Sequence, residues 1–283
     1  MLGFTVASMR NLERNRQHEE IARSARYVGM ALERDLQETG VSLASTVTFG
    51  SLSVRGDTVV ILRVPFEPAE APPPPLVPPA GTDNPLPPGG TCGPACVTVD
   101  TGGNPFDIEI GDLARMQISG ERRLILVTDV QVSGTNADVT FTADSTLLGY
   151  QAGWAGGVQL DRFATFVQKL NLTAYYQDGA TLKRADALLP NGSPAGEIVV
   201  YGIRDWDAWI LFTDGDEAEY ANPNDSDPSN DFDDLLGVRI EAELAGDHPL
   251  LRTPPAGSPD PTEVFEWRFA PRNLTYERNQ IAS

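Results

Sequence analysis

The longest stretch of the sequence without a helix breaker lies near its start. Residues 8–39 contain no proline and only one glycine, with Arg, Glu and Gln throughout. Apolar residues recur in it at spacings of four, three, four and four, which places them on one side of a helix. These residues are Ile21, Ala25, Val28, Leu32 and Leu36. The segment predicts a long amphipathic helix, closed by Gly40, whose apolar face packs on the rest of the chain.

After the helix the sequence changes to short runs rich in β-branched and aromatic residues, most of them separated by turn residues. The runs are 46–54, 57–64, 113–118, 123–132, 138–142, 170–177, 197–203, 209–213, 238–244 and 264–269. We therefore predict an α+β fold, in which a long N-terminal amphipathic α-helix packs on a mostly antiparallel β-sheet body. Residues 1–40 would form the helical part and residues 41–283 a β-rich globular domain.

Two segments interrupt the predicted strands. Residues 65–90 hold eleven of the 23 prolines, which exclude helix and central strand, so an extended surface insertion is expected. Residues 214–234 hold nine carboxylates and no basic residue, with Asn, Ser and Pro between them. This composition predicts a solvated acidic loop.

The charge balance argues against two classes of partner. The net charge of −19 opposes phosphate backbones and anionic bilayer surfaces, so broad nucleic-acid binding is not expected. A membrane-spanning helix needs about 18 to 20 apolar residues in a row. The best apolar runs here, 59–62 and 124–127, are four residues long, and no secretory signal peptide is recognisable before the charges that begin at Arg10.

The two cysteines, Cys92 and Cys96, lie close together in the hexapeptide TCGPAC. Gly93 and Pro94 favour a tight turn that brings the two sulfurs together, so a local disulfide is the preferred interpretation. A redox-active pair would have two intervening residues and a following helix, whereas three residues intervene here and a strand-like run follows. A metal site is less favoured still, because no second pair of ligands follows.

The sequence shows no recognisable catalytic motif. The two histidines, His18 on the charged helix and His248 before a proline, are expected at the surface, and no nucleophile elbow, phosphate loop or dinucleotide fingerprint occurs. Four tryptophans offer rings of the kind that line sugar sites, but packing in a sheet is the commoner use of tryptophan. They are Trp154, Trp206, Trp209 and Trp267. We therefore expect that the chain is not an enzyme, has no catalytic residues and requires no cofactor.

Calcium is the one metal for which the sequence offers ligands. Carboxylate oxygens in the acidic loop are the hard donors that Ca²⁺ prefers, but the full EF-hand spacing is missing. The candidate ligands are Asp214, Asp216, Asp225, Asp227 and Asp231. The preferred interpretation is a solvated loop that binds no metal, and calcium binding is the alternative.

Residues 31–40 carry an aliphatic pair, Arg-Asp-Leu and a closing Gly. This run is similar to the helix end of the PilW-like type IV minor pilins, and several later segments resemble the same family in the same order. Further similar segments are the Gly-Asp-strand and Val-Thr segments at 111–113 and 127–130, the tyrosine hairpin at 174–184, the strand at 196–205, and the closing segments at 236–240 and 271–274. Gly3, Phe4 and Thr5 imitate a prepilin cleavage motif, but Ser8 stands where that motif has Glu.

The resemblance implies a structural subunit of a type IV pilus that joins or primes the filament through its N-terminal helix. The apolar half of that helix would precede residue 1 and anchor an inner-membrane precursor with a periplasmic domain, later displayed in an extracellular pilus or pseudopilus. Implied partners are other minor and major pilins, the assembly platform and the prepilin peptidase. The arginines of the helix would face solvent or neighbouring subunits, and they are Arg10, Arg14, Arg16, Arg23 and Arg26. Alternatives are a J-type pseudopilin of type II secretion and, from another class, a secreted β-sandwich module that binds calcium or carbohydrate.

Overall fold

The computed structural model describes residues 2–65, 72–77, 85–86, 91–93, 95–118, 121–142, 146–151, 158–159, 165–246 and 261–274. Most of the predicted insertion at 65–90 lies outside these ranges, as do Trp154 and His248. The side chains of residues 1–11, 13 and 14 are also outside the description, so the roles predicted for Arg10 and Arg14 are not addressed by the structure.

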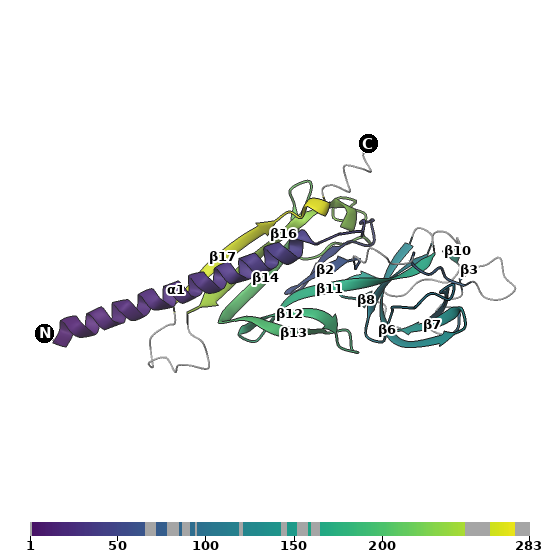
Figure 1. The fold of residues 1–283 in the computed structure, drawn as a ribbon. Helices are drawn as coiled ribbons and strands as arrows, with labels where there is room; N and C mark the ends of the chain where they lie inside the picture. Colours follow the sequence, from purple (N-terminus) through teal and green to yellow (C-terminus); the bar gives the residue numbers. More distant parts are fainter. Residues whose placement is uncertain are drawn as a thin grey trace.

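A single long helix, α1 (Leu2–Gln37), precedes all the strands and projects from one end of an elongated molecule (Figure 1). The first strands are β1 (Leu52–Arg55), β2 (Thr58–Arg63), β3 (Pro85–Leu86), β4 (Cys96–Asp100), β5 (Leu113–Ile118), β6 (Glu121–Ser133) and β7 (Asn136–Phe141). Three two-residue strands follow, namely β8 (Thr146–Leu147), β9 (Tyr150–Gln151) and β10 (Val158–Gln159). The remaining elements are β11 (Phe166–Asp178), β12 (Thr181–Leu188), β13 (Pro194–Tyr201), β14 (Ile203–Phe212), β15 (Glu217–Ala218), the 3₁₀ turn η1 (Phe232–Asp234), β16 (Leu235–Ala245) and β17 (Thr262–Phe269).

The long strand β11 organises the larger of the two main sheets. Its first part, Phe166–Leu170, pairs with β5, and its second part pairs with β2 on one side and β12 on the other. The nine-stranded sheet therefore runs β1-β2-β11-β5-β6-β7-β4, with β12 and β13 continuing from β11. A separate four-stranded sheet has the order β15-β14-β16-β17. Every pair of strands in the described ranges is antiparallel, as expected for strands joined by short hairpins.

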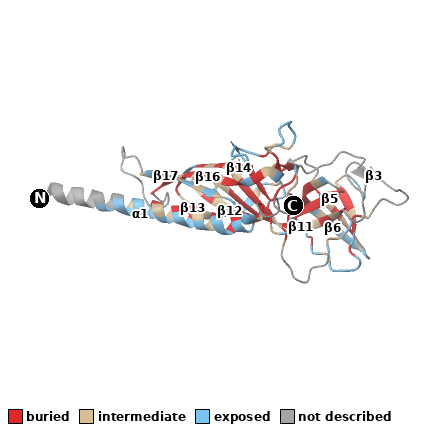
Figure 2. Cartoon of the chain, turned by 90° about the horizontal axis from the view of Figure 1, so that it is seen from above, coloured by how far each residue is buried: buried red, intermediate tan, exposed pale blue. Residues whose placement is uncertain are grey.

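The large sheet borders two hydrophobic cores. The main core lies between α1, the four-stranded sheet and β1, β2, β11 and β12, with further side chains from β5 and β6, and contains Trp206 and Tyr175. A smaller core fills the distal lobe of β4 to β7 and contains Val97, Met116 and Val139. Buried positions follow the strands of both parts, whereas α1 carries a long exposed side (Figure 2).

The predicted α+β class is wrong. Strands make up 52% of the structure and helix only 14%, with α1 as the one helix of seven or more residues among the described parts. The reason is the length of the strands, since β6 and β11 each extend to 13 residues and β12 continues to Leu188, beyond the hairpin expected at 174–184. The protein is a mainly antiparallel β-protein, and no helical layer covers the described distal lobe (Figure 1).

A disulfide joins Cys92 to Cys96 at the start of β4, in agreement with the expected local link. The cysteines lie only four positions apart, so the bond closes a very short loop at the edge of the distal lobe. It constrains this turn and does not connect separate elements of the fold.

Candidate functional site

One side of α1 is buried in the main core. The five apolar residues predicted from the helical spacing are all buried, with exposed fractions between 0% and 4%. At Gly29 the helix comes so close to β17 that an added Cβ would lie 2.7 Å from the indole Nε1 of Trp267. These apolar side chains are enclosed by their own chain, so between Ile21 and Leu36 the side of α1 that stays open to contact is the opposite one.

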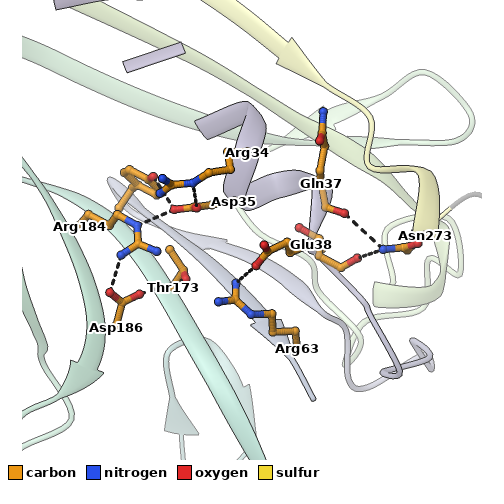
Figure 3. Close-up of polar contacts among 11 residues, drawn as sticks. Arg34, Asp35, Gln37, Glu38, Arg63, Thr173, Arg184, Asp186 and Asn273 are labelled. Atoms are coloured by element: carbon orange, nitrogen blue, oxygen red, sulfur yellow. Dashed lines mark hydrogen bonds and ion pairs between the residues drawn. The ribbon is translucent and has the colours of Figure 1, made fainter. Parts of the chain in front are cut away.

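Asp35 fixes the end of the helix to the sheet through a buried polar network (Figure 3). Tyr175 Oη donates to Asp35 Oδ2 at 2.7 Å, and the guanidinium Nε of Arg184 donates to the same oxygen at 2.5 Å. Arg34 Nε donates to Oδ1 at 2.9 Å. Burial alone would raise the pKa of Asp35, but the hydrogen bonds from Arg184, Arg34 and Tyr175 outweigh it and hold this pKa below its ordinary value. The carboxylate is therefore ionised and fully engaged at neutral pH.

Two further contacts hold the C-terminal end of α1. Asn273, just after β17, donates its side-chain amide to the carbonyl oxygens of Gln37 at 3.4 Å and Thr39 at 2.9 Å (Figure 3). These carbonyls belong to the helix end, where no intrahelical donor is left for them. Glu38 forms an ion pair of 2.7 Å with Arg63 of β2. The chain then leaves the helix at Gly40, whose φ of +75° suits glycine.

The opposite side of α1 is exposed and mixed in character. Tyr27 and Met30 keep 59% and 70% of their surface exposed. Arg23 and Arg26 lie on the same side, and neither forms an ion pair with another described residue. We call these four residues the arginine face of α1. They contribute to a groove of about 650 Å³, whose other described lining residues are His18, Glu19 and Ala22.

His18 lies at the border between the two sides of the helix. Its Nδ1 is 2.5 Å from Glu263 Oε1 at the start of β17, and both side chains are partly exposed. No nucleophile lies in hydrogen-bond contact with this histidine among the described residues. His18 thus links the helix to the four-stranded sheet.

The acidic loop, residues 214–234, is ordered largely by its own carboxylates. Asp214, Asp225 and Asp227 each accept a hydrogen bond from a backbone amide two residues further on. Such contacts stabilise a turn without any partner outside it. At Asp227 the hydrogen bonds from Ser229 lower the carboxyl pKa. Phe232 anchors the loop to the body, with its ring 5.1 Å from that of Tyr150.

The five predicted calcium ligands do not form a recognisable metal site within the described ranges. Asp214 and Asp216 lie in the turn after β14, whereas Asp225 and Asp227 bind within their own turn. Asp231 is buried, and its pKa is raised by that burial and by the nearby Asp233 and Asp234. Within the described ranges, no three His, Cys, Asp or Glu side chains are placed to hold a metal ion.

The described tryptophans have three different environments. Trp206 is buried in the main core, and its indole Nε1 donates to the carbonyl oxygen of Asp57 at 2.9 Å. Trp267 packs toward α1 at Gly29. On the outer side of the four-stranded sheet, the guanidinium of Arg239 lies over the Trp209 ring at 3.7 Å. The three rings therefore do not form a shared sugar-binding platform.

Sequence reasoning missed the Asp35 network, although it contained one signal for it. Asp35 follows Ile21 and Val28 at a spacing of seven residues, so it falls on the buried side of the helix. A carboxylate at such a position requires a cation or hydrogen-bond donors. Its partners were not identifiable, because Arg184 lies 149 residues further along the chain.

No protein-family model, curated protein or solved structure matches this chain. In the described parts, α1 is not apolar enough over 18 residues to be a membrane-crossing helix.

Proposed function

We propose that this chain is a structural subunit of a type IV pilus, of the PilW-like minor pilin kind, that joins or primes the filament through its N-terminal helix. The observation that carries the proposal is the two-sided character of α1, which is locked to its own body on one side and exposed on the other. A filament subunit needs such an element, because the helix must move with the body and still present a surface to the next subunit.

The proposal extends to partners and location. The arginine face of α1 would contact other minor or major pilins, and the assembly platform and prepilin peptidase would act on the membrane-anchored precursor. The precursor would lie in the inner membrane with the β-rich body in the periplasm, before display in an extracellular filament. A J-type pseudopilin of type II secretion would use the same two-sided helix, so an experiment has to distinguish a type IV pilus subunit from a pseudopilin.

Photo-cross-linking in cells tests the proposal directly. A photoreactive phenylalanine analogue replaces Met30, which is 70% exposed on the arginine face. We expect cross-links to pilin subunits, identified by mass spectrometry. A matched control places the analogue at Val132, which is 63% exposed in the distal lobe and should give few such products.

Deletion of the gene supplies the functional readout. Loss of surface filaments, restored by the intact gene, supports a pilus subunit, whereas loss of protein secretion with intact filaments supports the pseudopilin. Normal filaments and normal secretion, together with no pilin among the cross-linked products, would reject both.

A further inference from the structure

The charges of the molecule are unevenly distributed between α1 and the acidic loop. The whole chain carries a net charge of −19, yet residues 21–32 contain two arginines and no carboxylate, and Glu19 is the one acidic residue among the described residues that line the same groove. Both arginines, Arg23 and Arg26, are exposed and lack an ion-pair partner in the described part of the chain. An unpaired basic patch on an acidic protein is a recognition feature, because it attracts carboxylates that the rest of the surface repels.

The acidic loop offers the complementary surface. Most of its carboxylates are exposed, and no Lys or Arg of the described chain pairs with Asp214, Asp216, Glu219, Asp225, Asp227 or Asp233. Glu217 is different, because Arg239 and Arg268 both contact it. Tyr220, exposed to 55%, adds an aromatic side chain to this surface.

The arginine face and the acidic loop lie at different positions along the axis of α1. The loop is fastened to the segment that follows α1, where Phe232 donates its backbone amide at 3.2 Å to the carbonyl oxygen of Val47, ten residues beyond the helix end at Gln37. Arg26 lies eleven residues before the helix end at Gln37, a distance of about 16 Å along the axis. Complementary patches offset along one axis match a head-to-tail contact between copies, which repeats without closing.

We propose that the acidic loop of one copy of this chain docks on the arginine face of α1 in the next copy. Arg23 and Arg26 bind loop carboxylates, for which the planar guanidinium is well suited, and Tyr27 and Met30 supply apolar contact area. Repulsion between the two net charges is weak at physiological salt, because the screening length is about 8 Å and only contacting groups interact strongly. The inference rests on the proposed function for its filament setting and specifies which surfaces meet.

Disulfide trapping between two purified variants tests the contact. Met30→Cys and Ser226→Cys place single new thiols on the arginine face and in the acidic loop, and the two native cysteines are already bonded to each other. When the variants are mixed under mild oxidation, we expect the Met30–Ser226 heterodimer to form at least about tenfold faster than random pairs. Ser133→Cys, exposed in the distal lobe, is the matched partner that should not react with the Met30 variant. Equal rates for both pairs would overturn the proposal.

Charge reversal gives an independent test by sedimentation at 0.15 M salt. Arg23→Glu with Arg26→Glu, or Asp216→Arg with Glu219→Arg, should weaken self-association about tenfold, and mixing the two reversed proteins should restore it. The control Asp107→Arg with Glu109→Arg makes the same charge change at exposed sites near β5 and should not show this pattern. No recovery in the mixture, or an equal effect of the control, contradicts the docking.

These experiments use the chain alone, so they fail separately from the proposed function. Specific trapping, together with cross-links in cells that reach only copies of this chain, would support the contact and reject the pilus assignment. Cross-links from Met30 to other pilins without trapping between copies would support the assignment and reject self-docking.

Discussion

Asp35 stabilises the fold through its charge, because three donors surround its buried carboxylate. Its pKa in the folded protein is lowered, so the folded state binds its proton less tightly than the unfolded chain, whose pKa is near 3.9. This stabilisation is fully present above that value and is lost as the pH falls through the lower pKa of the folded state.

The substitution Asp35→Asn should therefore reduce the free energy of unfolding by about 2 kcal/mol at pH 7, because Arg184 and Tyr175 keep only a neutral partner. Denaturant titrations between pH 7 and pH 2 should show the difference from the wild type shrinking below about pH 4. Asp186→Asn is the control, since Asp186 also binds Arg184 but is 60% exposed, and should cost less than about 1 kcal/mol. A difference that stays constant over the whole pH range would contradict the ionic role of Asp35.

Gly237 provides a second test at the level of one residue. A Cβ at this position of β16 would lie 1.9 Å from the carbonyl oxygen of Phe269 in β17, so Gly237→Ala should separate the two strands. We expect a loss of about 3 kcal/mol or more in chemical unfolding. Gly134→Ala is the comparison, because its Cβ would meet no atom within 4 Å and only the positive φ opposes it. That variant should lose only about 1 to 2 kcal/mol.

Individual residues show what could be predicted from the sequence. Helical spacing assigns Leu32 and Leu36 to the buried side correctly, because the period of a helix is a local property. The partners of Asp35 depend on the tertiary fold, and the charged residues Lys183, Arg184 and Asp186 concealed the strand pattern of β12. Asp231 was expected in solvated acidic sequence, yet it is buried beside the anchored Phe232.

At the level of elements, α1 has a buried side and an exposed side. Its apolar residues repeat with the period of the helix and are buried in the main core, whereas Tyr27 and Met30 on the other side are exposed to solvent. The sequence predicted the helix and most strands but not their proportion, because strand ends depend on pairing partners that periodicity does not specify. The fold class was therefore wrong while the apolar side of α1 was assigned to the correct residues.

The two sides of α1 should respond differently to the same kind of truncation. Leu32→Ala removes a fully buried side chain from the main core and should lower the free energy of unfolding by about 3 kcal/mol. Met30→Ala removes a side chain that is 70% exposed and should change it by less than about 0.5 kcal/mol. Thermal and denaturant unfolding measure both. Equal losses would mean that Met30 also belongs to a packed surface within the chain.

At the scale of the whole molecule, the presence of two cores predicts that the distal lobe and the part that contains α1 can unfold separately. They are connected through β11, which pairs with β5 at its start and with β2 and β12 further along. They are also connected through β6, because Leu124 lies in the main core and Ile125 in the distal core. Each core still has its own set of buried side chains, so local opening of one part should leave the other folded. Such independence would keep α1 fixed to its sheet while the distal lobe adapts to its surroundings.

Hydrogen exchange on core variants tests this division. Val139→Ala truncates a fully buried side chain of the distal core and should cost about 2 kcal/mol there. We expect faster amide exchange in β4 to β7, with unchanged protection in β14, β16 and α1. Ile240→Ala, in the main core, should give the reverse pattern. If either variant accelerates exchange equally in both parts, the molecule opens as one unit, and movement of the distal lobe cannot be separated from that of α1.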